Sequence, residues 1–111
     1  MFEKDLNIGF LLDFYGELLT EKKRSVMDMY FNEDFSLAEI AEQIGISRQG
    51  VRDIIKKCED ELLFYEEKLG LAKKMQSVEA EANALCELSL SANIPKDIRD
   101  KIIKLSELIR Q

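Results

Sequence analysis

The residues best suited to binding chemistry lie in one short stretch, SRQGVRDIIKK, which runs from residue 47 to residue 57. Arginine can pair bidentately with guanine and glutamine with adenine, while serine and lysine suit phosphate oxygens. The stretch therefore predicts a surface for nucleic acid, with DNA as the expected partner. Six polar or basic residues make up what we call the recognition surface: Ser47, Arg48, Gln49, Arg52, Lys56 and Lys57.

The basic residues of this stretch follow a helical spacing. Arg48, Arg52 and Lys56 succeed one another at four-residue steps, so on a helix they form one stripe. Residues 47–58 contain four basic side chains and one acid, Asp53, which gives a local net charge of +3. The alternative is a solvated helix face with scattered charge, because helix surfaces are commonly charged and Asp53 weakens the stripe.

The chain lacks the usual groups of an enzyme. It contains no histidine, the commonest base beside a serine or cysteine nucleophile. Its glycines form no phosphate-binding loop, and its runs of carboxylates are typical of the solvated side of a helix. Cys58 and Cys86 are far apart in the sequence, so no zinc site is expected. We therefore expect a protein that is not an enzyme and that binds no metal or other cofactor.

Composition narrows the class of protein further. The 111 residues are 46% hydrophobic and 34% charged, a balance typical of a single, helix-rich soluble domain. We find neither a secretion signal nor an apolar run that could span a membrane, and the two cysteines suit reduced thiols. These features favour a cytoplasmic protein that does not bind a membrane. The net charge of −6 repels DNA at long range, so a single copy should bind it weakly.

Two short helices joined by a tight turn are expected to position the recognition surface. Ser36 and Glu39 have the spacing of a capping box at the start of the first helix, and Gly45 suits a left-handed turn after it. Ser47 can cap the second helix. This combination predicts a helix-turn-helix over about residues 36–58. The inward residues are expected to be Leu37, Ile40, Ala41, Ile44, Val51, Ile54, Ile55, Cys58 and Leu62.

The segments before and after this motif also have helical periodicity. Apolar residues between positions 8 and 19 form one helical stripe, and Thr20 can cap a second helix that ends at residues 32–34. After the motif the helix continues to Leu69, and Gly70 permits a break. No segment has the alternation of a strand, so an all-α fold is predicted.

Residues 71–109 carry a long apolar seam of a kind that suits another helix. Its members are Leu71, Met75, Val78, Ala82 and Leu85, followed after Pro95 by Ile98, Ile102, Leu105 and Ile109. The tail either folds back on its own domain or contacts a second subunit. Because the seam is long for so small a core, we favour subunit contact and expect a homodimer.

The chain also resembles known proteins. Residues 18–57, LLTEKKRSVMDMYFNEDFSLAEIAEQIGISRQGVRDIIKK, resemble the promoter-reading region 4 of bacterial sigma factors. Together with FLLDFYG at residues 10–16 and the chain length, the sequence resembles more closely the YlxM family. These are small proteins with a proposed DNA-binding role, encoded beside the signal recognition particle GTPase in Gram-positive bacteria. The resemblance covers about the first two thirds of the chain.

Periodicity and resemblance lead to one expected architecture. The fold should be all-α, with a sigma-region-4-like helix-turn-helix bundle in residues 1–69 and a C-terminal helical extension in residues 70–111 that serves oligomerisation. The resemblance implies a DNA-binding regulatory protein with a role in the signal recognition particle pathway. The alternative is a non-DNA adaptor that binds the GTPase of the particle or its RNA.

Overall fold

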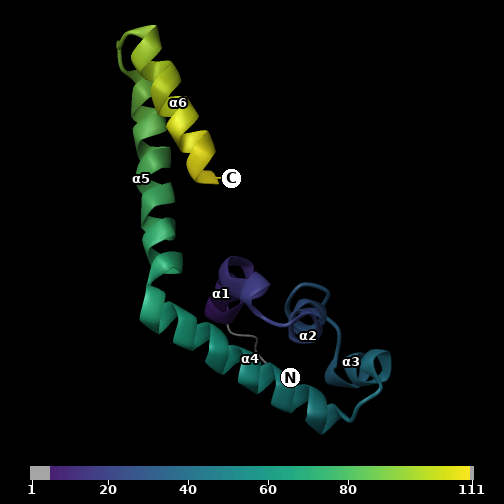
Figure 1. Ribbon diagram of the computed structural model, residues 1–111. Coiled ribbons are helices and arrows are strands. Elements are labelled where there is room, and N and C mark those ends of the chain that lie inside the picture. The colour runs from purple at the N-terminus through teal and green to yellow at the C-terminus, as the bar shows by residue number, and fades with distance from the viewer. Residues whose placement is uncertain (1–5, 111) are drawn as a thin grey trace. The chain divides into compact units, whose positions relative to one another are not determined.

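The computed structural model describes residues 6–110, which are helical almost throughout (Figure 1). These residues form six α-helices and one short 3-10 helix, with no strand among them. The prediction of an all-α helix-turn-helix bundle with a C-terminal helical extension is confirmed. The chain divides after Gly70 into two compact units, Met1–Gly70 and Leu71–Gln111.

The first unit holds the helix-turn-helix. Its elements are α1 (Leu6–Tyr15), η1 (Gly16–Leu18), α2 (Glu21–Phe31), α3 (Leu37–Ile44) and α4 (Arg48–Leu69). The periodicity of residues 8–19 predicted one continuous helix, whereas α1 ends at Tyr15 and a 3-10 turn follows. Gly16 explains the difference, because glycine is a poor helix former and this one is buried. A Cβ atom there would lie 3.4 Å from Leu12 Cδ1.

Helix α4 is the scaffold of the first unit, and it packs against α1, α2 and α3. Two polar contacts also join it to its neighbours. The hydroxyl of Tyr15 donates to Glu66 Oε1 at 2.7 Å, and Lys23 Nζ lies 2.6 Å from Glu61 Oε1. The fully buried side chains of this core include Ile8, Leu11, Val26, Met27, Ile40, Val51, Cys58 and Leu62. The N-terminal half of α4, which carries the recognition surface, is therefore held on a packed support.

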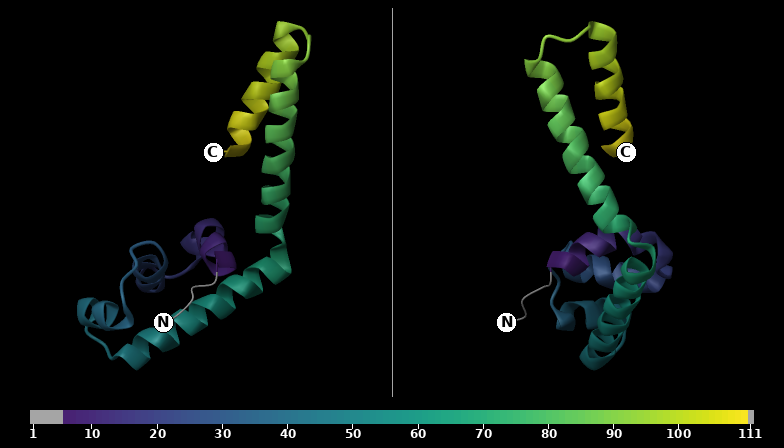
Figure 2. Two further views of the ribbon diagram at one scale, coloured as in Figure 1. Left: turned by 180° about the vertical axis from the view of Figure 1, so that it is seen from behind. Right: turned by 90° about the vertical axis from the view of Figure 1, so that its left-hand side faces the viewer.

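The second unit is an antiparallel helical hairpin of α5 (Leu71–Ser91) and α6 (Lys96–Arg110) (Figure 2). Arg99 closes the hairpin by donating from Nε to the carbonyl oxygen of Ser89 and from Nη2 to that of Ala92, both at 3.0 Å. These carbonyls belong to the C-terminal end of α5, where helices leave acceptors without intrahelical partners. Ser89 and Ser106 are buried. The hairpin thus closes around small and polar groups.

The length and apolar character of a helix decide whether it can cross a membrane. Within residues 6–110, none combines the length and the apolar character that crossing a bilayer requires.

Candidate nucleic-acid interface

The turn between α3 and α4 has the local geometry that the sequence predicted. Ser36 Oγ accepts from the amide of Glu39 at 3.1 Å, and Glu39 Oε1 accepts from the amide of Ser36 at 3.0 Å, so the capping box is present. Hydrogen bonding from Ser36 to the Glu39 carboxylate, chiefly from the backbone amide of Ser36, lowers the pKa of this carboxyl because it favours the charged form. Gly45 ends α3 with φ of +80°, and its amide donates to the carbonyl oxygen of Ala41 at 2.8 Å.

The start of α4 is fixed by a second serine cap. Ser47 Oγ accepts from the amide of Gly50 at 3.0 Å. A Cβ atom on Gly50 would lie 3.2 Å from Ser47 Oγ and 3.4 Å from Ile46 Cδ1. Gly50 has a low helix propensity, but it leaves room for the serine cap and for the side chain of Ile46 in the corner of the turn.

All six residues of the recognition surface are exposed on α4 or at its N-cap. Val51 and Ile55, on the opposite side of the same turns, are buried. Arg48, Gln49 and Arg52 border one groove, whereas Lys56 and Lys57 lie beyond it along the helix. The structure therefore brings three of the predicted residues together with Ser47 and sets the two lysines apart from them.

The groove also contains residues that the sequence analysis did not assign to the surface. The N-cap Ser36 and the first two residues of α3, Leu37 and Ala38, line it together with Arg48 and Arg52. Helix N-terminal turns carry a partial positive charge, and arginine side chains reinforce it, so this groove suits an anionic group. The sequence signal for it was the presence of two serine-capped helix starts within one motif.

Two residues of the recognition surface contact acidic side chains. Gln49 Nε2 donates to Asp53 Oδ1 at 3.0 Å, and Lys56 Nζ lies 3.4 Å from Asp60 Oδ1. The second pair is exposed and four residues apart on a helix, so it contributes little to stability and can be exchanged for a phosphate contact. The first pair engages the carboxamide that would otherwise be presented to a base.

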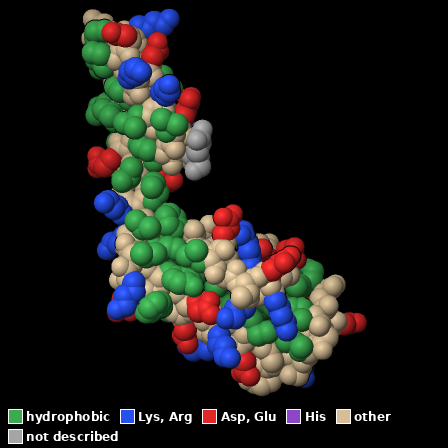
Figure 3. Space-filling model, in the orientation of Figure 1, with side chains coloured by type: hydrophobic (Ala, Val, Ile, Leu, Met, Phe, Trp, Pro, Cys, Tyr) green, Lys and Arg blue, Asp and Glu red, His purple; other side chains and the backbone are tan. Residues whose placement is uncertain are grey.

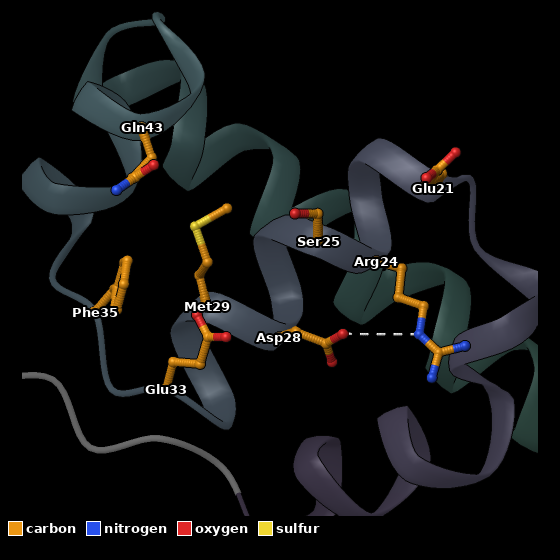
Figure 4. A pocket seen from close by; sticks show the side chains of 8 residues that line it. All are labelled: Glu21, Arg24, Ser25, Asp28, Met29, Glu33, Phe35 and Gln43. Carbon is orange, nitrogen blue, oxygen red and sulfur yellow. Dashed lines mark ion pairs between the residues drawn. The ribbon is translucent and has the colours of Figure 1, made fainter.

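A second groove on the first unit lies between α2 and α3 and has the opposite charge (Figure 4). The guanidinium group of Arg24 is already shared, with Nε 3.7 Å from Asp28 Oδ2 and Nη1 3.8 Å from Glu17 Oε1. Because carboxylates outnumber the single arginine, this groove does not suit a phosphate. Its lining consists of Glu21, Arg24, Ser25, Asp28, Met29, Glu33, Phe35 and Gln43.

The thiols and carboxylates form no metal centre in the part of the chain that the structure describes. Cys58 is buried and Cys86 is half-buried, and neither is in a disulfide. Burial raises the pKa of the Cys58 thiol to about 11, since desolvation disfavours the thiolate. Cys58 is therefore a neutral core side chain at neutral pH.

Comparison with known proteins identifies relatives over almost the whole chain. A family model described as "Putative helix-turn-helix protein, YlxM / p13 like", UPF0122, matches residues 2–108. A UPF0122 protein of Clostridium kluyveri is 45% identical over 102 residues, which cover 90% of this chain and 92% of the relative. One of Clostridium perfringens is 45% identical over 109 residues, 96% of this chain and 97% of the relative. One of Caldanaerobacter subterraneus is 56% identical over 73 residues, 66% of this chain and 62% of the relative.

Proposed function

Because the chain belongs to the UPF0122 family of YlxM/p13-like helix-turn-helix proteins, we propose that it is a regulatory protein that binds DNA through its recognition surface. The observation that carries the proposal is the position of Arg48, Gln49 and Arg52. They are exposed at the start of α4, on the side away from the buried Val51. In helix-turn-helix proteins, the N-terminal residues of the second helix contact base edges in the major groove.

Each residue of the surface has a role that follows from its chemistry and position. Arg48, Gln49 and Arg52 read bases, because the paired donors of arginine match guanine and the donor and acceptor of the glutamine amide match adenine. Ser47 and the two lysines contact phosphates, which position the protein without reading sequence. The groove between α3 and α4 receives one such phosphate. Lys56 leaves Asp60 to make its contact.

Because the chain as a whole is negatively charged, DNA binding requires two copies of it. The net charge of −6 opposes the approach to DNA, while the local charge of residues 47–58 is +3. A homodimer that binds a palindromic or repeated site places two such surfaces on one duplex and multiplies their contacts. Residues 71–109 hold this dimer together.

A second candidate function rests on two exposed apolar side chains of α4. Leu63 is 45% and Phe64 54% exposed, and both lie beyond Lys57 in the C-terminal half of this helix. Lys68 Nζ lies 5.8 Å from the centre of the Phe64 ring. Aromatic residues are enriched in protein interfaces, and unpaired RNA bases stack on aromatic rings. In this function the chain is an adaptor, and α4 contacts the GTPase of the signal recognition particle or its RNA.

One binding experiment separates the two functions. Double-stranded DNA is selected from a random pool on the full chain at physiological salt, and selected and scrambled duplexes are then compared by fluorescence anisotropy. A regulator should bind its selected site on the order of a thousandfold more tightly than a scrambled one. An adaptor should show salt-sensitive binding without preference, together with salt-resistant binding to a purified particle component. Replacing Leu63 and Phe64 with Ala should then weaken only the particle contact.

A further inference from the structure

The hairpin of α5 and α6 has no large apolar side chain that is fully buried. Its buried residues, among those that the structure describes, are Ala72, Ser89 and Ser106, all of them small. Units of about 40 residues bury too little surface to be stable alone and usually gain stability from disulfides, metals or oligomerisation. The hairpin has no disulfide, and no metal-binding cluster occurs in residues 6–110. The hairpin therefore gains a larger core only by packing against another surface, either its own domain or a second copy of the chain.

One side of helix α6 carries polar contacts. Arg99 donates to the carbonyl oxygens of Ser89 and Ala92 at the end of α5, and within α6 Arg110 Nη2 donates to the hydroxyl of the buried Ser106 at 2.6 Å. The apolar stripe of α6 lies at the edge of this side, because 100° per residue turns it away from Arg99 and Ser106, and its members Ile102 and Ile109 are half-buried. Ile98 is 49% and Leu105 52% exposed, although they are among the most apolar residues of α6.

A shallow apolar groove follows this stripe. Ile98, Ile102 and Leu105 form it, and Asp97 and Lys101 stand at its rim. Figure 3 shows hydrophobic side chains along the hairpin on the face in view. Soluble monomers rarely expose contiguous apolar surface of this kind. The other exposed large hydrophobic side chains of the hairpin are Leu71, Met75, Leu85, Leu88, Leu90 and Leu108.

We infer that the stripe Ile98–Ile102–Leu105–Ile109 is the contact face between two copies of the chain, whose α6 helices pair antiparallel to complete a four-helix bundle. The inference rests on the dimer proposed above and names the face that forms it. A stable dimer buries about 800 Å² on each partner, or about 20–30 residues a side. Helices of 21 and 15 residues can supply a face of that size.

Charge along the edge of the stripe favours a second copy and sets its direction. The exposed edge presents Asp97 first and Lys101 and Lys104 later. In an antiparallel pair the same edges meet, so each aspartate lies opposite a lysine of the other copy. In a parallel pair opposite edges meet, so this aspartate would not face the lysines of its own edge. An edge of mixed charge also lacks the strong positive potential that a nucleic acid would need.

The first test is the mass of the full chain in solution, measured by light scattering over a range of concentrations. The unchanged chain should be a dimer, and Leu105→Asp should weaken the dimer by about a hundredfold or more, because it would bury a carboxylate in the contact. Leu63→Asp, at a similarly exposed leucine of α4, is the matched control and should remain dimeric. An unchanged chain that stays monomeric, or a Leu105→Asp variant that dimerises normally, would overturn the inference.

The second test reports the direction of pairing and does not depend on a destabilised variant. In chains that carry Cys86→Ser, Ile98→Cys and Leu105→Cys are introduced separately, and a tagged and an untagged chain are mixed and oxidised. Antiparallel pairing predicts that the mixed disulfide forms faster than either self-disulfide. Dominant self-disulfides would overturn the antiparallel arrangement, and the absence of any disulfide would overturn the face.

Failure of this inference is distinguishable from failure of the proposed DNA binding. If only the dimer face is wrong, changes at Leu105 leave the dimer intact while the recognition surface still binds its site. If only DNA binding is wrong, the disulfide pattern and the dimer persist although no duplex is preferred. In the Leu105→Asp variant a single copy should still bind a half-site with the single-copy affinity.

Discussion

The carboxamide of Gln49 donates a hydrogen bond of 3.0 Å to Asp53, one turn further along α4. The donor that could pair with adenine is therefore engaged by Asp53, the only acid in residues 47–58. Asp53 also places a negative charge among four positive ones. The Gln49–Asp53 pair should weaken DNA binding in two ways. Its hydrogen bond engages the carboxamide of Gln49, and the charge of Asp53 repels phosphate.

Asp53→Asn should therefore tighten DNA binding. Removing a charge near a phosphate is worth about 1 kcal/mol in water, or roughly fivefold in the dissociation constant. Glu67→Gln is the matched control, because it also removes one exposed carboxylate of α4, far from the start of the helix, and should have a smaller effect. Anisotropy titrations on one duplex compare the two variants. Equal or weaker binding by Asp53→Asn would show that Asp53 does not face the nucleic acid.

Lys56 and Lys57 should contribute to affinity without contributing to sequence preference. Replacing both with Ala should weaken binding to every duplex by a similar factor and reduce the slope of log K against log salt by about 2, close to one for each phosphate contact. Lys22 and Lys74 are exposed on other helices and provide the control pair. If the control pair changed the slope as much, the effect would reflect the net charge alone.

The sequence predicted those features that depend on neighbouring residues. The Ser36–Glu39 capping box, the left-handed Gly45 and the Ser47 cap each follow from local spacing, and together they located the recognition surface. The groove shared with the start of α3 was missed, because it depends on how two helices cross, which spacing does not specify. The side of α6 that meets α5 was also not predictable. It depends on hydrogen bonds from Arg99 to distant carbonyl oxygens of the α5 terminus.

The capping box should stabilise the first unit in a way that depends on pH. Ser36→Ala should lower the free energy of unfolding by about 1 kcal/mol, the usual cost of losing a serine cap. Because folding lowers the pKa of Glu39, its contribution is present above its ordinary value of 4.5 and disappears as pH falls through the lowered value. Urea unfolding of Glu39→Gln should accordingly differ from that of the unchanged chain at neutral pH, and the difference should disappear as pH falls below the lowered pKa of Glu39. A difference that persisted in acid would argue against the charged cap.

The two cysteines should differ sharply in reactivity. The thiolate is the reactive form, and burial raises the pKa of Cys58 to about 11, so iodoacetamide should modify Cys58 at least about a hundredfold more slowly than Cys86 at neutral pH. Because the unfolded thiol ionises first, stability should also fall as pH rises from 9.0 towards 11. Mass spectrometry of the alkylated chain gives both rates. Equal rates in the folded chain would mean that the Cys58 site opens readily.

The most direct test of DNA binding replaces Arg48, Gln49 and Arg52 with Ala and measures affinity for the selected duplex at physiological salt. The matched variant also loses two positive charges and one carboxamide, at exposed positions on other helices: Lys22, Lys74 and Gln76. Both variants should unfold within about 0.5 kcal/mol per substitution of the unchanged chain. The recognition variant should lose roughly 3 kcal/mol or more of binding free energy, which raises its dissociation constant over a hundredfold. It should also lose its sequence preference, whereas the matched variant should keep that preference. A recognition variant that bound the duplex as tightly and as selectively as the matched one would contradict the proposal.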